Sequence, residues 1–473
     1  MFYLCWSVWL DVRTYINQSG TDDVWQRLYI LLMMILLAGF AGNATAITIT
    51  DIRDTLTEGT AEGGAAEGAA SSALEGAAAA AAEGSSEGGA SENAARAVLA
   101  GASWLASRAA EASAEPEIDH NAHLIGSYYF TIGWHEALYW SIAFFLIAKG
   151  ARLLLSFVYG ILLPRFRKAL WLQGLFIAMV AVVFLPLMFV KSTDAVMLLC
   201  VIGVFLDISM KYVIAAASQW LHGRTKHAGH HTFFPAVSVE HLQERMLLFS
   251  ILVIGESILN STYTASPGNF GFSEQFGRSA LGIIISFGFM WLTFDADGSR
   301  TYVHALRRHW LPAITFTNVY YPLCASMILM SSALSKLIGE NDVTQGYLWI
   351  FGGSLSCAMA CVATMAFLHE SLDLHGSALA PTKLRIAVRY LVAVIFALIP
   401  LKRGWTGTHF LAVYACILII VVAFETLGKL GAIGRVYDAD KAAALEQWRI
   451  QQSRDRASRS RSPSGDQSDL ELG

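Results

Sequence analysis

The chain has 473 residues, of which 55% are hydrophobic and only 15% are charged, and its formal net charge is −4. Soluble domains carry about 25% charged residues, and a soluble fold of this length has no means of burying so much apolar surface. The composition therefore excludes an ordinary soluble protein and predicts helices whose outer faces contact lipid.

Runs of about 20 apolar residues are long enough to cross the hydrocarbon core of a bilayer as helices. Residues 1–10 are apolar but too short to span, so we expect a partial helix that continues a segment missing from the start of the chain. The fold class is predicted to be all-α, a polytopic transmembrane helical bundle of about ten complete spans plus this N-terminal partial helix. The predicted spans are 26–49, 138–163, 170–190, 196–219, 241–264, 276–294, 311–338, 345–369, 384–401 and 409–430.

Composition divides the chain into four regions. Residues 1–50 hold the partial helix and the first complete span, and residues 51–123 form a low-complexity insert of Ala, Gly, Ser and Glu. Residues 124–430 form the transmembrane helical bundle, and residues 431–473 are a tail rich in Arg and Ser. The insert holds thirteen Asp and Glu against three Arg and has few residues suited to a core, so we expect no packed domain there. A functional tether and a neutral insertion both fit this composition.

Lys and Arg in short loops predict the orientation, because cytosolic loops carry an excess of positive charge. The richer side is predicted to be cytosolic, which places the C-terminus in the cytosol and the insert outside or in a lumen. Besides the tail, that side collects Arg13, Arg165, Arg167, Lys168, Arg224, Lys226, Arg300, Arg307, Arg308 and Lys383.

Charged residues inside the 241–264 span are candidate functional residues, since a charge at membrane depth is costly unless it faces a protein interior. Arg245 and Glu256 are eleven residues apart, which places them about 20° from full register on one helix face. Glu244 lies near the helix N-terminus, where the helix dipole favours a carboxylate. One interpretation is a polar path for a proton or cation, and the other is a set of salt bridges that lock the helices together.

Two further carboxylates complete the predicted path. Asp207 lies in the 196–219 span, four residues before Lys211, a spacing at which the two charges neutralise each other. Asp295 and Asp297 follow the 276–294 span and suit cation binding, but a local ion pair of Asp295 with the nearby Arg300 is the favoured interpretation. We therefore predict a substrate or ion path made of Glu244, Arg245, Glu256, Asp207 and Asp295.

The sequence predicts no metal site, no cofactor and no enzyme. Residues 222–231 hold four His, but no Cys or carboxylate completes a site there and the basic neighbours oppose a cation. No Gly-rich phosphate loop or His-Glu-x-x-His motif occurs, which excludes a pump with its own ATPase within this chain. An intramembrane enzyme that acts on lipid has support only from His369, Asp373 and His375.

Several separated blocks carry a family resemblance. They are Trp6-Ser-Val-Trp9, Thr21-Asp-Asp-Val-Trp-Gln-Arg27, Glu240-His-Leu-Gln-Glu-Arg245 with Gly255-Glu-Ser257, Phe294-Asp295 and Tyr321-Pro322-Leu323. In order and spacing these blocks resemble the low temperature requirement A family of multi-pass membrane proteins, in what looks like a fungal form. The family's opening helix is not found here, and the insert separates two helices that are normally close in sequence. The resemblance implies an integral membrane protein with no established reaction.

The leading functional prediction is transport or permeation of a proton, a cation or a small solute. The alternative is a non-transporting membrane sensor or scaffold with the tail as its cytosolic output. In either case the expected partner is the lipid bilayer, and no nucleic-acid partner is expected.

Overall fold

The computed structural model describes residues 1–19, 24–51, 118–125, 128–227, 238–263, 273–294, 302–371 and 379–430, with residues 447, 450 and 451. Most of the predicted insert and of the tail lies outside these residues. The described residues form two compact units: unit 1 holds those up to Met210, and unit 2 holds those from Lys211 onward. Residues 124–430, predicted as one bundle, thus contribute to both units.

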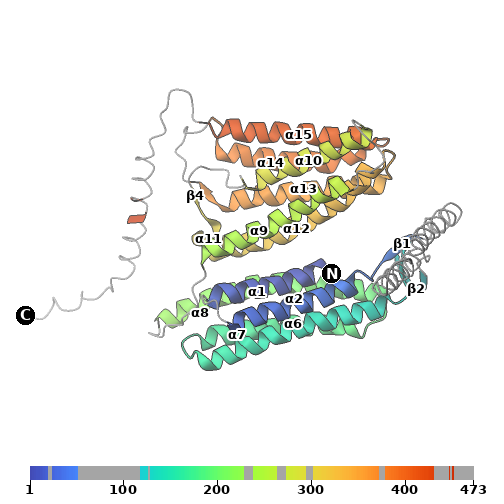
Figure 1. Ribbon diagram of the computed structural model, residues 1–473. Helices are drawn as coiled ribbons and strands as arrows, with labels where there is room; N and C mark the ends of the chain where they lie inside the picture. The colour runs from blue at the N-terminus through green and yellow to red at the C-terminus, as the bar shows by residue number, and fades with distance from the viewer. Residues whose placement is uncertain are drawn as a thin grey trace, which may run out of the picture. The chain divides into compact units, whose positions relative to one another are not determined.

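Unit 1 is a group of helices that lie lengthwise beside one another (Figure 1). Helix α6 is its centre and packs against α1, α2 and α7. A three-stranded antiparallel sheet in the order β1–β3–β2 joins this unit, with Ile49 opposite Phe130. The elements are α1 Phe2–Ser19, α2 Val24–Ala44, β1 Ile49–Asp51, β2 Ile118–Ile125, β3 Tyr128–Thr131, α6 Trp134–Leu162, α7 Arg167–Phe184, the 3₁₀ turn η2 Leu185–Met188 and the first part of α8 Thr193–His227.

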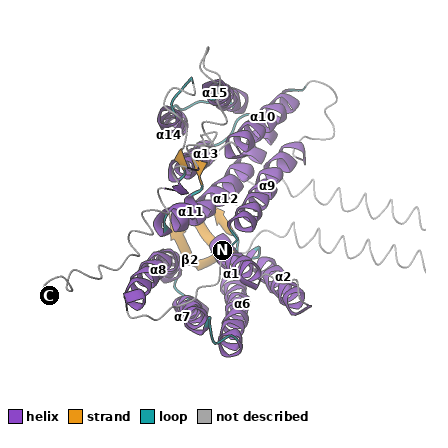
Figure 2. Ribbon diagram, turned by 90° about the vertical axis from the view of Figure 1, so that its left-hand side faces the viewer, coloured by secondary structure: helices purple, strands orange, loops and turns teal. Residues whose placement is uncertain are grey.

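Unit 2 holds the last part of α8 and the remaining helices, which Figure 2 shows nearly end on. Helix α12 packs on α9 and α13, α13 packs on α14, and α10 packs on α9 and α15. The short strands β4 and β5 pair antiparallel, with Tyr302 opposite Ser371. The elements are α9 Val239–Tyr263, α10 Glu274–Phe294, β4 Tyr302–Val303, α11 Ala305–Arg308, α12 Trp310–Gly339, α13 Gln345–Leu368, β5 Glu370–Ser371, α14 Thr382–Leu398, the 3₁₀ turn η3 Ile399–Leu401 and α15 Gly407–Gly428.

Nine helices of the described chain are long and apolar enough to cross a membrane, and each corresponds to one of the ten predicted spans. They are α2, α6, α7 with η2, α8, α10, α12, α13, α14 with η3, and α15. The tenth predicted span is the helix α9, whose 25 residues include four charged side chains and which is not among the nine. The prediction of an all-α polytopic bundle is confirmed.

The first helix is longer than the sequence predicts. The apolar run of residues 1–10 indicates only a partial helix, whereas α1 continues through Asp11 and Arg13 to Ser19. Arg13 is buried, with its guanidinium 5.5 Å from the centroid of the Trp9 ring, so it does not act as the loop charge that the orientation argument assumed. Tertiary contacts sustain this helix beyond its apolar part, which hydrophobicity alone does not reveal.

Close packing joins α13 to its neighbours at Gly352. A Cβ added to Gly352 would lie 2.5 Å from Cγ of Pro400, 2.5 Å from the Tyr414 hydroxyl and 3.1 Å from the carbonyl oxygen of Phe396. Gly353 follows it on the exposed side of the same helix, and a Cβ there would meet nothing within 4 Å. The two neighbouring glycines therefore differ only in what surrounds them.

We predict that Gly352→Ala lowers the unfolding free energy by about 1–3 kcal/mol, because the added methyl group overpacks the contact between α13, α14 and α15. Gly353→Ala should leave stability unchanged or raise it, since alanine favours a helix over glycine. Thermal unfolding of the detergent-solubilised protein measures both, and equal unfolding temperatures for the two variants would contradict the described packing.

Candidate functional site

The predicted path residues on α9 lie away from the interior of unit 2. Glu244 is 67% exposed with its Oε2 3.7 Å from His241 Nδ1, Arg245 is half-buried and Glu256 is exposed. Their register along the helix is as predicted, but α10 and α12 pack against a different face, which holds Met246 and Ser257. Glu256 is next to Ser257 and so lies about 100° around the helix from it. The role of these three residues stays a prediction.

Of the two other predicted residues, Asp295 lies outside the described residues and Asp207 is buried in unit 1. Only 3% of Asp207 is exposed, in the middle of α8. Its Oδ2 accepts hydrogen bonds from the hydroxyls of Tyr3 and Ser7, the latter at 3.3 Å, and both come from α1. Asp207 is therefore the predicted residue that the structure places in a buried polar environment.

Lys149 of α6 extends this environment. Its Nζ donates to Ser7 Oγ at 2.8 Å and to Asp11 Oδ2 at 2.5 Å, and the Lys149 side chain is 3% exposed. Ser7 thereby contacts both Lys149 and Asp207. The five side chains Tyr3, Asp207, Ser7, Lys149 and Asp11 form one continuous chain of hydrogen bonds, which we call the unit 1 relay.

A second polar group lies further along the same two helices. The buried Arg152 guanidinium is 5.1 Å from the centroid of the Tyr15 ring, a cation–π distance. The hydroxyls of Tyr15 and Tyr159 are hydrogen-bonded at 3.1 Å. Arg152 follows Lys149 by three residues on α6, so the two cations occupy the same helix face.

The sequence analysis missed most of the relay, although its signal is present. Tyr3, Ser7, Asp11 and Tyr15 follow one another at intervals of four residues, which places them on one stripe of a helix. The apolar run of residues 1–10 hides this signal, because it is too short to indicate a span. Lys149 lies within the 138–163 span and is likewise a charge at membrane depth.

Unit 2 contains a buried ion cluster that the sequence analysis also missed. Arg389 Nε donates to Glu425 Oε1 at 2.7 Å, and Arg385 NH1 lies 3.6 Å from Glu425 Oε2. All three side chains are at most 1% exposed, and they join α14 to α15. The signal was the three charges inside the predicted spans 384–401 and 409–430.

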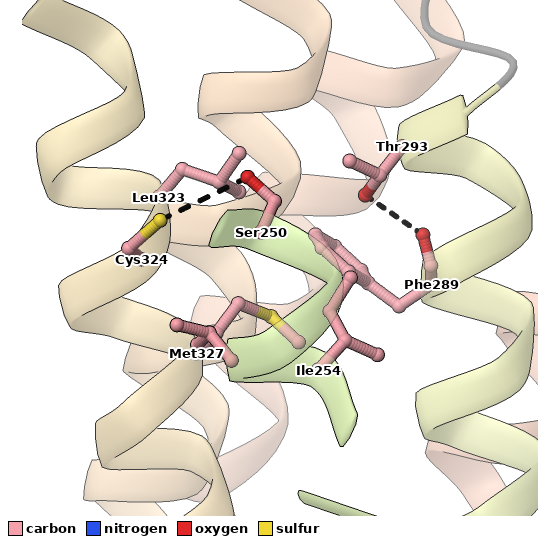
Figure 3. Close-up of a pocket in the computed structure, with 8 residues that line it drawn as sticks. Ser250, Ile254, Phe289, Thr293, Leu323, Cys324 and Met327 are labelled. Atoms are coloured by element: carbon pink, nitrogen blue, oxygen red, sulfur yellow. Dashed lines mark hydrogen bonds between the residues drawn. The ribbon is translucent and has the colours of Figure 1, made fainter. Parts of the chain in front are cut away.

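A small cavity lies where α9, α10 and α12 meet in unit 2 (Figure 3). Its volume is about 10 Å³, which is room for one water at most, so it is too small for a solute. The Thr293 hydroxyl donates to Phe289 O at 2.9 Å, and the Ser250 hydroxyl donates to Met246 O at 3.1 Å. Both hydroxyls are hydrogen-bonded to backbone carbonyls of their own helices, and apolar side chains form most of the rest of the cavity wall.

Among the described residues, no group of three or more His, Cys, Asp or Glu is placed to hold a metal ion. The segment with four His, residues 222–231, is partly helical. Helix α8 continues through it as far as His227, and the rest lies outside the described residues.

The model of one protein family, described as the bacterial low temperature requirement A protein (LtrA), matches residues 96–423. The chain belongs to the low temperature requirement A family. The residues that match LtrA include Lys149 and Asp207, whereas Tyr3, Ser7 and Asp11 precede them. No curated protein and no solved structure matches this LtrA chain.

We predict that Glu425→Gln lowers the unfolding free energy by about 3–5 kcal/mol, because it leaves two buried arginines without their shared carboxylate. Glu256→Gln is the matched control: it makes the same chemical change at an exposed position and should cost no stability. Thermal unfolding in detergent compares the two. A larger loss of unfolding free energy for Glu256→Gln than for Glu425→Gln would contradict the burial of Glu425 and the exposure of Glu256.

Proposed function

We propose that this multi-pass LtrA protein conducts protons and that the unit 1 relay carries them. Transport or permeation of a proton, a cation or a small solute was the broader expectation. One observation supports the narrower choice: Tyr3, Asp207, Ser7, Lys149 and Asp11 are linked side chain to side chain by direct hydrogen bonds.

Each member of the relay is a group that can accept or release a proton. A hydroxyl both donates and accepts a hydrogen bond, a carboxylate accepts one and an ammonium donates. A proton that reaches Asp207 can therefore move on by exchange of donors and acceptors through Ser7 to Lys149 and Asp11. Because the donors and acceptors are in direct contact, a solute or hydrated cation has no place between them.

The relay is also long compared with the thickness of the membrane. Tyr3 and Asp11 are eight residues apart on α1, which is about 12 Å along the helix axis. The hydrocarbon core is about 30 Å thick, so the relay accounts for more than a third of a crossing. Tyr15 lies one further turn along, and its hydrogen bond with Tyr159 extends the polar stripe to about 18 Å.

The relay combines groups of both charges. Its hydrogen bonds join two carboxylates, Asp11 and Asp207, to the ammonium of Lys149. A neutral Asp207 would still occupy the same hydrogen bonds, which lets the relay change charge without changing shape.

The other path residues extend the proposal into unit 2. Glu256 is an exposed carboxylate on a helix of hydrocarbon length, and such a group needs a proton or a partner. We assign Glu256 as a second proton-accepting group, with Glu244, Arg245 and Asp295 as accompanying path residues. We also propose that the C-terminus is cytosolic and that the sequence is a fungal form of the family.

Asp207→Asn should reduce proton flux by about tenfold or more, because an amide keeps the shape of the carboxylate but cannot carry the proton. The protein is reconstituted in liposomes with an internal pH-sensitive dye, and flux is measured after a pH step. Asp194→Asn is the matched control, since Asp194 is exposed in the first turn of the same helix and should retain flux within about twofold of the unchanged protein.

Unfolding temperatures of the two variants separate a conduction defect from misfolding. Equal flux through the unchanged protein and Asp207→Asn would remove the relay from the mechanism. Flux no greater than that of empty liposomes would reject proton conduction altogether. The remaining alternative would then be a membrane sensor or scaffold, which predicts that deletion of residues 451–473 abolishes its output.

A further inference from the structure

Two histidines of unit 2 accept hydrogen bonds from consecutive backbone amides. Nδ1 of His369, the residue after α13, accepts from the N–H of Ala305 at 3.1 Å. Nδ1 of His304 accepts from the N–H of Leu306 at 3.2 Å. These are the first two amides of α11, so both imidazoles stabilise the same helix start.

This geometry determines the protonation state of both rings. A neutral imidazole has one nitrogen that donates and one that accepts, whereas a charged imidazolium donates from both. Because both Nδ1 atoms accept, His304 and His369 are neutral here and carry their proton on Nε2. Protonation at Nδ1 would place a donor against a donor at each amide.

The surroundings oppose a positive charge on either ring. The His304 and His369 ring centroids are 4.7 Å apart, and the Phe316 ring lies 4.8 Å from the first and 5.3 Å from the second. His304 is 8% exposed and His369 is 7% exposed. Burial lowers the pKa of His369 from 6.5 to about 4, which agrees with a neutral ring.

Among the described residues, the charged groups of the neighbouring elements face one another. On α11, Arg307 and Arg308 are exposed cations. The nearby carboxylates already face them: Glu240 of α9 is 3.2 Å from Arg307, and Glu370 of β5 is 3.6 Å from Arg308. From α12 come the apolar ring of Phe316, in an edge-to-face contact with Tyr320, and the exposed His309 at the N-terminal cap.

The two histidines lie where separate parts of unit 2 are joined. His304 precedes α11 and α12, whereas His369 follows α13. The β4–β5 pair runs beside them, with Val303 opposite Glu370. We propose that His304 and His369, with the amides of Ala305 and Leu306, form an acid-released latch that holds the start of α11 against the end of α13.

When the pH is low enough to protonate the two rings, each Nδ1 takes up one proton from the medium. Both amide hydrogen bonds are then lost, and two cationic rings come into contact. The sign follows from the lowered pKa of His369. Its stabilising contribution is complete above about pH 6.5 and is lost as the pH falls toward about 4. An LtrA protein in an acidified compartment would therefore loosen this end of unit 2, whether or not unit 1 conducts protons.

Hydrogen exchange of the full-length protein in nanodiscs tests the latch. We expect protection of the Ala305 amide to fall roughly 50-fold between about pH 7 and about pH 4.5, after correction for intrinsic exchange, from the two pKa values of His369, and protection of the Leu306 amide to fall with it. His369→Asn should keep its protection at the lower pH, because the Asn Oδ1 can accept from Ala305 and does not titrate there. Hydrogen exchange is measured on peptides that cover residues 302–309, so the test does not depend on transport activity.

His309→Asn is the matched control, since His309 is exposed and its Nδ1 caps α12 through Leu311 at 3.4 Å. It should leave the pH dependence of residues 302–309 unchanged. If His369→Asn does not fold, His304→Asn replaces it, because asparagine is a favourable helix cap. Unchanged protection of the wild-type amides across this pH range would overturn the proposal, as would loss of the pH dependence in His309→Asn.

Discussion

The structure depends on one constraint: an ionised side chain inside a helix of membrane length must be solvated by other parts of the protein. Lys149 illustrates it, because a buried ammonium in an apolar helix is stable only with partners such as Asp11 and Ser7. These partners come from α1, so the charge of α6 determines where α1 packs. Asp207 of α8 extends the same requirement to a third helix.

The two units satisfy this constraint with different chemistry, and the difference indicates where function lies. In unit 2, Arg385 and Arg389 share Glu425, and a guanidinium does not lose its proton in proteins. That cluster is suited to holding α14 and α15 together. In unit 1 the Ser7 hydroxyl lies between the charges of Lys149 and Asp207, and it accepts from the first and donates to the second. The unit 1 relay is therefore suited to changing its proton content, which is why the proposed function is assigned to it.

The Gly-Glu-Ser block shows how one short motif serves two purposes. Ser257 is fully buried, and its hydroxyl lies 2.9 Å from that of Ser286, so it fastens α9 to α10. Ser261, one turn later, receives a hydrogen bond on its carbonyl from Ser279 at 2.9 Å. Small hydroxyl residues of this kind let membrane helices approach closely. Glu256 directly precedes Ser257 in sequence but lies on the exposed side of the helix, so it has no part in this packing.

The sequence by itself determined the membrane class and the position of nearly every span, because apolar length is a local property that the bilayer thickness fixes. It also placed Asp207 among the functional candidates, since a carboxylate inside a span is conspicuous even with Lys211 four residues away. It could not decide which face of a helix is buried, and so it placed Glu256 and Asp207 together although only Asp207 is enclosed. Only the tertiary structure joined Tyr3, Ser7, Lys149 and His369 to their partners, because those contacts connect residues far apart in the chain.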